Sequence, residues 1–330
     1  MRWTACELHA HTMHSDGDLT PEELLLRCKA LGVEAVAVTD HSTESAHQEI
    51  DRNGLETILP IIRGMEWTTF YGHALIVGCS GQVDWRDATV ENIDDMFRRV
   101  HSFGGIAGVA HPYAVGDPVC CGCNWEFDLQ DWSLADMMEV WHGSLPQFSE
   151  YNTRAFEKWT TLLDQGIRVT ATAARDLHGP EDDSVPYAVT YLLMDETGDT
   201  TDAFKDAIRN RRAYVSVGPT VELEASSAGT RAGIGGTLAA GPARFSTTVG
   251  CLHRRLAWEQ FRIVPQRVVL IGRYGEELAE LELDPERLER EPIEYTVQIP
   301  HASGQVRLEV HGTMGDDPCR LAVTNPILFE

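Results

Sequence analysis

Three histidines and an aspartate lie within eight residues near the start of the chain. The segment ELHAHTMHSDG (7–17) contains His9, His11, His14 and Asp16. Side chains two residues apart on a β-strand point to the same side, so His9 and His11 can share a metal ion. An HxH pair alone is a weak signal, and the rest of the chain has to distinguish a metal site from chance.

Residues of the same ligand types recur at the ends of later apolar runs. They are Asp40, His41, Glu66, His111, His142, Asp176 and His178, and the last two repeat the spacing of His9 and His11. Any one of them is equally consistent with an ordinary polar residue where a strand meets a loop. As a set, nitrogen and carboxylate ligands predict a centre for Zn, Fe or Mn rather than Ca or Mg.

The surrounding pattern alternates strand-like and helical segments. Strands are expected at 33–41, 58–67, 73–78, 105–113, 137–143 and 168–179, and helices at 19–32, 91–103, 148–165 and 201–212. The alternation predicts an α/β fold with a mainly parallel sheet, and polar residues at successive strand ends favour a β/α barrel over an open doubly wound sheet. Residues 221–330 alternate short strands with turns. We therefore expect a barrel at 1–220 and a smaller β-rich, sandwich-like domain at 221–330.

Composition limits the partners. The formal net charge is −24, and Lys29, Lys158 and Lys205 are the only lysines. Sequence-independent binding of nucleic acid needs clustered Lys and Arg, so we expect no stable nucleic-acid complex. The sequence shows neither a signal peptide nor an apolar run of about 18 residues, so we expect a cytoplasmic protein without a membrane partner.

Several motifs together resemble a known family. HAHTMHSDG (9–17), TDH (39–41), GMEW (64–67), AHP (110–112), WHG (141–143) and RDLH (175–178) look like the successive motifs of the polymerase and histidinol phosphatase (PHP) superfamily. Within it, GMEWTTFYGHALIVG (64–78) and RRAYVSVGPT (211–220), followed by a β-rich tail, resemble the carbaryl-hydrolase-like (CehA/McbA) subgroup.

The resemblance implies a distorted (β/α)7 barrel with a trinuclear centre of divalent ions (two or three of Mn, Fe or Zn) at its C-terminal face. One ion would take His9, His11, Glu66 and Asp176. A second would share Glu66 and add His111 and His142, and the third would take Asp16, His41 and His178. All nine matching positions hold competent ligands.

Three positions have other expected roles. Arg175 stands where many relatives have Ser, and it can either clamp a substrate phosphate or turn away into a salt bridge. His73 can contact substrate or support Glu66. His14 matches no ligand position, and we expect a loop or supporting residue there.

The cysteines and tryptophans near the motifs have simpler interpretations. The run CCGC (120–123) lacks a second cysteine pair with zinc-finger spacing, so we expect ordinary thiols. The tryptophans near the motif segments can line a substrate pocket, although most such aromatics belong to the core; they are Trp67, Trp125, Trp132 and Trp141.

The expected activity follows from the metal chemistry. Closely spaced ions hold a hydroxide at neutral pH and bind the attacking and leaving oxygens. Glu66 would bridge two ions, while Asp176 or a nearby histidine such as His178 would protonate the leaving group. This predicts a metal-dependent phosphoesterase that hydrolyses a small phosphate mono- or diester with a metal-bridging hydroxide.

Three alternatives differ in substrate or class. A carbamate or ester hydrolase can use the same centre, and a non-catalytic, metal-stabilised binding module needs only the ligands. An amidohydrolase-type barrel commonly needs a strand-end lysine, whereas all three lysines lie in helical patterns.

Overall fold

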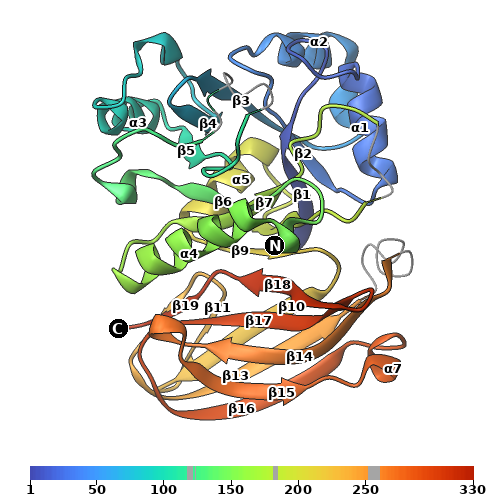
Figure 1. The fold of residues 1–330 in the computed structure, drawn as a ribbon, viewed down its shortest axis with the longest axis vertical. Helices are drawn as coiled ribbons and strands as arrows, with labels where there is room; N and C mark the ends of the chain where they lie inside the picture. Colours follow the sequence, from blue (N-terminus) through green and yellow to red (C-terminus); the bar gives the residue numbers. More distant parts are fainter. Residues whose placement is uncertain (117–121, 123, 181–184, 252–260) are drawn as a thin grey trace.

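Seven strands form the sheet of the N-terminal part of the chain (Figure 1). The computed structural model describes residues 1–116, 122, 124–180, 185–251 and 261–330. The seven strands are adjacent in sequence order: β1 (Arg2–Ala10), β2 (Ala35–Val38), β3 (Ile61–Thr69), β4 (Gly72–Val77), β5 (Ile106–Val109), β6 (Met137–His142) and β7 (Thr170–Ala174). Four helices connect most of them: α1 (Pro21–Ala30), α2 (Ser45–Asn53), α3 (Ile93–Ser102) and α4 (Glu150–Asp164).

The sheet closes at the C-terminal ends of its strands. His11 N donates to Leu177 O at 2.9 Å, and Leu177 N donates to His9 O at 3.0 Å. These bonds join the end of β1 and the residue after it to the segment that follows β7, so the C-terminal ends of both strands lie at one rim. The expected α/β fold is confirmed.

Strand β4 departs from the expected β/α repeat. It pairs antiparallel with both β3 and β5, because only Phe70 and Tyr71 connect it to β3. A crossover between parallel strands needs a dozen or more residues, whereas a two-residue connection can only form a hairpin. The reversal places the beginning of β4, rather than its end, at the rim where β3 and β5 end.

Local signals set the first helix. Thr20 Oγ1 accepts from Glu23 N, and the Glu23 side chain accepts from Thr20 N at 2.9 Å, which is a complete capping box. Pro21 occupies the first turn, where its missing N–H costs nothing. The helix predicted at 19–32 is thus confirmed with slightly shorter bounds.

The C-terminal part is a sandwich of two sheets, as predicted. One sheet has the order β11-β10-β13-β16, and β14, β15, β17, β18, β19 and β12 form the other layer. Phe245 of β13 packs against Phe329 of β19 across the layers, with ring centroids 5.6 Å apart. The bounds are β10 (Thr220–Ser227), β11 (Thr230–Gly233), β12 (Thr237–Leu238), β13 (Gly241–Gly250), β14 (Ile263–Ile271), β15 (Glu277–Glu282), α7 (Pro285–Leu288), β16 (Ile293–Ala302), β17 (Gly304–Met314), β18 (Asp317–Thr324) and β19 (Ile327–Phe329).

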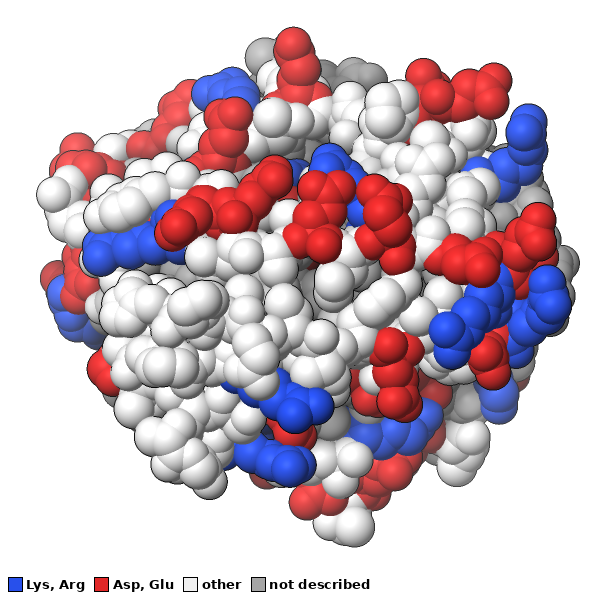
Figure 2. Space-filling view, turned by 90° about the horizontal axis from the view of Figure 1, so that it is seen from below, with Lys and Arg blue, Asp and Glu red and all other residues white. Residues whose placement is uncertain are grey.

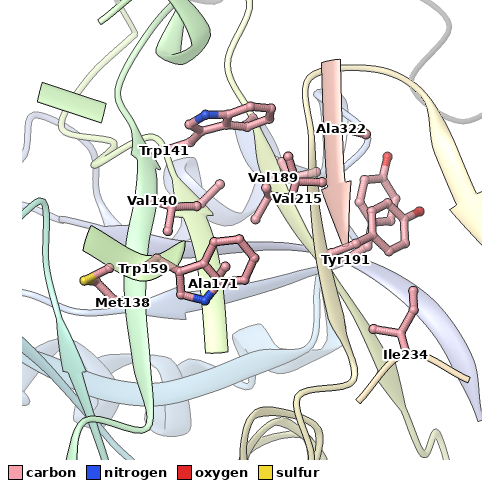
Figure 3. Close-up of a cluster of buried hydrophobic side chains, with 14 of the residues drawn as sticks. Met138, Val140, Trp141, Trp159, Ala171, Val189, Tyr191, Val215, Ile234 and Ala322 are labelled. Atoms are coloured by element: carbon pink, nitrogen blue, oxygen red, sulfur yellow. The ribbon is translucent and has the colours of Figure 1, made fainter. Parts of the chain in front are cut away.

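The two parts share a sheet and a core. Strand β8 (Val189–Met194) pairs with β1, and after α5 (Thr200–Arg209) strand β9 (Ala213–Ser216) pairs with both β8 and β18. Buried side chains of β6, α4 and β7 belong to the same cluster as Ile234 and Ala322 of the C-terminal part (Figure 3). The division at residues 220 and 221 stays a prediction, since hydrogen bonds between β9 and β18 cross it.

The surface and helices add two observations. The end of the molecule formed by the C-terminal strands shows Lys and Arg interspersed with Asp and Glu, without a continuous basic area among the described residues on that face (Figure 2). Among the described helices, none is long and apolar enough to cross a membrane.

Asn325 should be a strong stabiliser of the junction between the two parts. It is buried, its Oδ1 accepts from Ala171 N at 2.8 Å, and its Nδ2 donates to Ala171 O and Ala213 O. Asn325→Ala leaves buried Ala171 N without this acceptor and removes one donor each from Ala171 O and Ala213 O, and it should lower the free energy of unfolding by roughly 2–4 kcal/mol. Urea denaturation measures it, and exposed Asn53→Ala is the control, with an expected change within about 0.5 kcal/mol. Equal effects of the two variants would contradict this role.

Candidate metal centre

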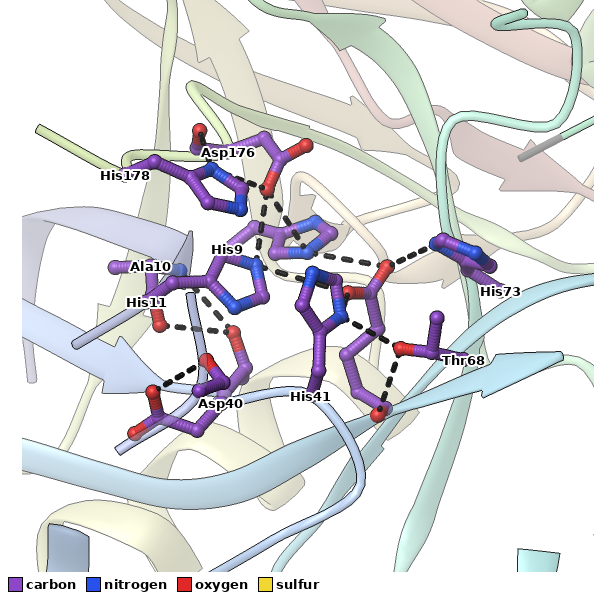
Figure 4. A network of polar contacts seen from close by, with 12 residues as sticks. His9, Ala10, His11, Asp40, His41, Thr68, His73, Asp176 and His178 are labelled. Carbon is purple, nitrogen blue, oxygen red and sulfur yellow. Dashed lines mark hydrogen bonds and ion pairs between the residues drawn. The ribbon is translucent and has the colours of Figure 1, made fainter. Parts of the chain in front are cut away.

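The nine residues expected as ligands converge at the closed rim of the barrel. Figure 4 labels five of them, His9, His11, His41, Asp176 and His178. Groups of potential ligand atoms lie within 4.8 Å of one another and overlap through shared members. The groups are His11–Asp16–His41–His178, His9–His111–Asp176, His9–His11–Glu66, Glu66–His73–His111 and His111–Glu139–His142. The structure therefore brings all nine together and adds His73 and Glu139; their roles as ligands stay predictions.

Glu66 is at the centre of the cluster. It is fully buried on β3, and its Oε1 lies 3.3 Å from His9 Nε2, 3.2 Å from His111 Nε2 and 3.0 Å from His73 Nδ1. Its Oε2 lies 2.7 Å from His41 Nδ1. Burial alone would raise the pKa of Glu66, but the surrounding imidazoles hold it well below the usual range.

Asp176 joins the other side of the cluster. Its Oδ1 lies 3.0 Å from His11 Nε2 and 3.3 Å from His9 Nε2, and its Oδ2 lies 3.1 Å from His142 Nε2. The residue has φ of +58°, and His111 has φ of +24°. Positive φ is uncommon in residues other than glycine, and such strained backbone concentrates at functional sites.

Asp16, His41 and His178 form the more exposed end of the cluster. Asp16 Oδ1 lies 3.2 Å from His178 Nε2, and its Oδ2 lies 3.4 Å from His41 Nε2. Burial would lower the pKa of His41, yet Asp16 and Glu66 raise it to about 10. The loop that carries Asp16 is fixed by buried Asp40, which accepts from Thr12 N at 2.8 Å and from Ser15 Oγ at 2.7 Å.

The site fits divalent cations. His9 Nε2, both ring nitrogens of His11 and Asp176 Oδ1 are buried and make no hydrogen bond among the described residues. Leaving so many imidazoles and carboxylates together without further partners is costly in a low-dielectric interior. The carboxylates of Glu66 and Asp176 also attract metal ions, and the mixed nitrogen and oxygen donors suit Zn, Fe or Mn.

Glu139 is a supporting residue that the sequence analysis missed. It is buried in the middle of β6, its Oε1 lies 2.9 Å from His9 Nδ1, and its Oε2 accepts from His111 N at 2.8 Å. When His9 Nδ1–H donates to this carboxylate, Nε2 is left unprotonated and faces Glu66 and Asp176. A charged residue inside the apolar run MMEVWHG (137–143) was the available signal.

The other three residues considered from the sequence lie in different environments. His73 contacts Glu66 and lines the cavity beside the cluster. Arg175 is buried with its guanidinium 5.0 Å from the Tyr187 ring centroid, and it is not among the residues that line this cavity. His14 turns away to Ser45 Oγ and Glu49 Oε2, as expected for a residue outside the ligand set.

The cavity beside the cluster has a volume of about 730 Å³ and one apolar wall. The apolar lining residues are Phe70, Tyr71, Trp85, Ala88, Ala114 and Val115, and Arg86 also lines the cavity. Phe70, in the β3–β4 turn, is 74% exposed. The tryptophans singled out from the sequence lie elsewhere: Trp67 and Trp141 are buried, Trp125 packs with Phe97 and Phe127, and Lys158 lies over Trp132. Cys120, Cys121 and Cys123 lie outside the described residues.

Comparisons with known proteins agree with this geometry. Residues 7–104 match the family model of the PHP domain. A segment of 69 residues is 44% identical to the 5′-3′ exoribonuclease Rnm of Escherichia coli K12, and 63 residues are 38% identical to a 5′-3′ exoribonuclease of Haemophilus influenzae. These matches cover 20% and 19% of this chain, and the chain spans only 23% of the length of either relative.

The whole fold has a solved counterpart. A two-domain protein from Bacteroides vulgatus, described as containing a predicted PHP-like metal-dependent phosphoesterase, superposes with a TM-score of 0.53. The match covers 99% of this chain and 95% of that one at 16% identity, so it supports the two-part fold. Residues 7–104 therefore resemble a PHP domain, and the whole chain shares the two-part fold of the Bacteroides vulgatus protein.

Glu139→Gln should weaken metal binding without changing the fold. The amide keeps the shape of the side chain but removes the charge that orients His9, and losses of this kind typically cost roughly 10–100-fold in metal affinity. Isothermal titration calorimetry of the metal-free protein with Mn²⁺ measures the affinity. Glu49→Gln is the matched control, because Glu49 contacts His14, which is not among the expected ligands. The Mn²⁺ affinity of this variant should equal that of the wild type. An unchanged affinity in Glu139→Gln would remove Glu139 from the site.

Proposed function

We propose that the protein is a metal-dependent phosphoesterase that hydrolyses small phosphate mono- or diesters. The observation that carries the proposal is the convergence of nine potential ligand residues from six strand ends, and six of these residues line one cavity. Two or three divalent ions, Mn, Fe or Zn, would be held by the groups around Glu66, Asp176 and Asp16. When bound, such ions lower the pKa of coordinated water and offset the charge of a phosphoryl group.

The residues of the chain divide the remaining work. Glu66 belongs to two of the ligand groups and can serve two ions at once. Glu139 and Thr68 orient His9 and His41, with Thr68 Oγ1 2.6 Å from His41 Nδ1. Asp176 and His178 lie beside the cavity, where either can pass a proton to a leaving oxygen. The apolar wall excludes water from the body of the substrate.

The size of the substrate follows from the surroundings. A cavity of about 730 Å³ suits a ligand of nucleotide size. The exoribonucleases that resemble residues of this chain cleave phosphodiesters, which supports an ester of that kind. The net charge of −24 favours a short phosphoester as substrate, because binding of a long nucleic acid needs clustered Lys and Arg.

Asp176→Ala should abolish activity. The change removes a carboxylate that lies within reach of His9, His11 and His142, and we expect metal content to fall and turnover to drop at least about 100-fold. The assay is release of p-nitrophenol from p-nitrophenyl phosphate and bis(p-nitrophenyl) phosphate with and without Mn²⁺. His14→Ala is the control and should keep wild-type turnover. Full activity of Asp176→Ala, or no metal-dependent turnover of either ester by the wild type, would count against the proposal.

A second candidate is hydrolysis of an aryl carbamate or ester at the same centre, as the CehA/McbA resemblance implies. It is favoured by the apolar wall, on which Phe70, Tyr71 and Trp85 offer aromatic surface, whereas Arg86 is the one arginine or lysine among the described lining residues. Flat aromatic groups gain roughly 0.5–1.5 kcal/mol from aromatic contacts beyond their buried area.

Phe70→Ala and Trp85→Ala should raise KM for aryl substrates, each by roughly 3–10-fold, with little effect on metal content. Hydrolysis of p-nitrophenyl phosphate and of 1-naphthyl methylcarbamate measures both candidate activities on the same variants. Exposed Tyr274→Ala, which does not line this cavity, is the control. If 1-naphthyl methylcarbamate is turned over faster than both phosphoesters, the second candidate replaces the first.

A further inference from the structure

A second cavity, of about 920 Å³, lies between α4 and the C-terminal strands. Figure 1 shows α4 between the two parts of the molecule, above β17 and β18. One wall is the helix, which contributes Asn152, Phe156, Glu157 and Asp164 among others. The opposite wall is the sheet, and the two cavities have no lining residue in common.

The sheet wall is cationic. Arg267, Arg307, His311 and Arg320 line it from β14, β17 and β18. Three arginines at one place are notable in a chain with 27 Lys and Arg against 51 Asp and Glu. Guanidinium groups are planar donors whose geometry matches carboxylate and phosphate oxygens.

The cations are held rigidly. Glu309 is 2% exposed and accepts from Arg307 Nε at 2.9 Å, Arg320 Nε at 2.7 Å and His311 Nε2 at 3.0 Å. The Arg320 guanidinium also lies 4.0 Å from the Phe156 ring centroid. One carboxylate thus orients two guanidinium groups and an imidazole, and such preorganisation lowers the ordering cost when an anion binds.

The helix wall is of opposite charge. Glu157 and Asp164 line it, and among the described residues neither forms an ion pair with Arg307 or Arg320. Thr153 and Thr160 also line the helix wall, where their hydroxyls donate to Ser149 O and Glu157 O and keep oxygen lone pairs as acceptors. Opposite charges facing each other across an open cavity match a ligand that carries both signs.

We propose that this cavity binds a small zwitterion. Its phosphate or carboxylate would contact Arg307 and Arg320 on the sheet wall, and its ammonium group would contact Glu157 on the helix wall. The site does not depend on the proposed hydrolase activity. It does adjoin the metal centre: Asn152 lines the cavity, its Oδ1 accepts from His142 N at 3.2 Å, and its Nδ2 donates to His142 O at 2.9 Å. Occupancy is therefore positioned to affect the backbone of a residue of the metal cluster.

The test must separate this site from the metal centre. Binding is measured by calorimetry on metal-free Asp176→Ala protein, whose fold is checked by thermal melting. The zwitterionic probes are phosphoethanolamine and γ-aminobutyrate. The single-charge probes, which carry charge of one sign only, are inorganic phosphate and ethanolamine. We expect one equivalent of a zwitterion to bind at least tenfold more tightly than either single-charge probe.

Variants of the two walls then have distinct signatures. Arg320→Met in the same background should weaken both the zwitterion and inorganic phosphate about tenfold or more. Exposed Glu157→Gln should weaken the zwitterion alone and leave phosphate binding unchanged, while Glu91→Gln, remote from the cavity lining, should change neither. The proposal is overturned if neither zwitterion binds Asp176→Ala, if single-charge probes bind as tightly, or if Arg320→Met binds like its parent. None of these results bears on hydrolysis by the wild type.

Discussion

The attraction between one buried carboxylate and the imidazoles around it organises this molecule. Glu66 cannot be ionised inside the barrel without compensation, and His9, His41, His73 and His111 supply it from four different segments. Each contact fixes the rim of a strand relative to its neighbours. The hydrogen bonds that close the sheet, between the end of β1 and the segment after β7, lie at that same rim. The contacts that close the barrel and those that assemble the site therefore lie at one place in the fold.

The sequence carried most of this information because ligand chemistry and strand periodicity act locally. An apolar run followed by His, Asp or Glu predicts a strand end with a potential ligand, and the nine positions that also match the PHP motifs converge in the structure. The N-cap at Thr20 was equally local. The direction of β4 was also accessible in principle, since two residues between strands exclude a crossover.

What the sequence could not supply depends on distant contacts. Glu139 lies inside a strand, and its importance appears only when β1 places His9 beside it. Trp85 lines the cavity because the chain passes beside the β3–β4 turn, whereas the tryptophans nearer the motifs pack into the core. Arg175 follows a ligand strand, but its neighbour Asp176 takes the inward position and the arginine packs against Tyr187. No local rule distinguishes these cases.

The reversed strand has a consequence for how this protein can change over time. In a parallel barrel, each loop over the site also connects a strand to its helix, so a change in the loop disturbs the packing of both elements. Here Phe70 and Tyr71 occupy a turn whose two arms, β3 and β4, are already held by their own ladder of hydrogen bonds. Residues can be exchanged or inserted at this tip while Glu66 and His73 keep their register. Selectivity can thus diverge among descendants of this chain while the ligand set is inherited intact.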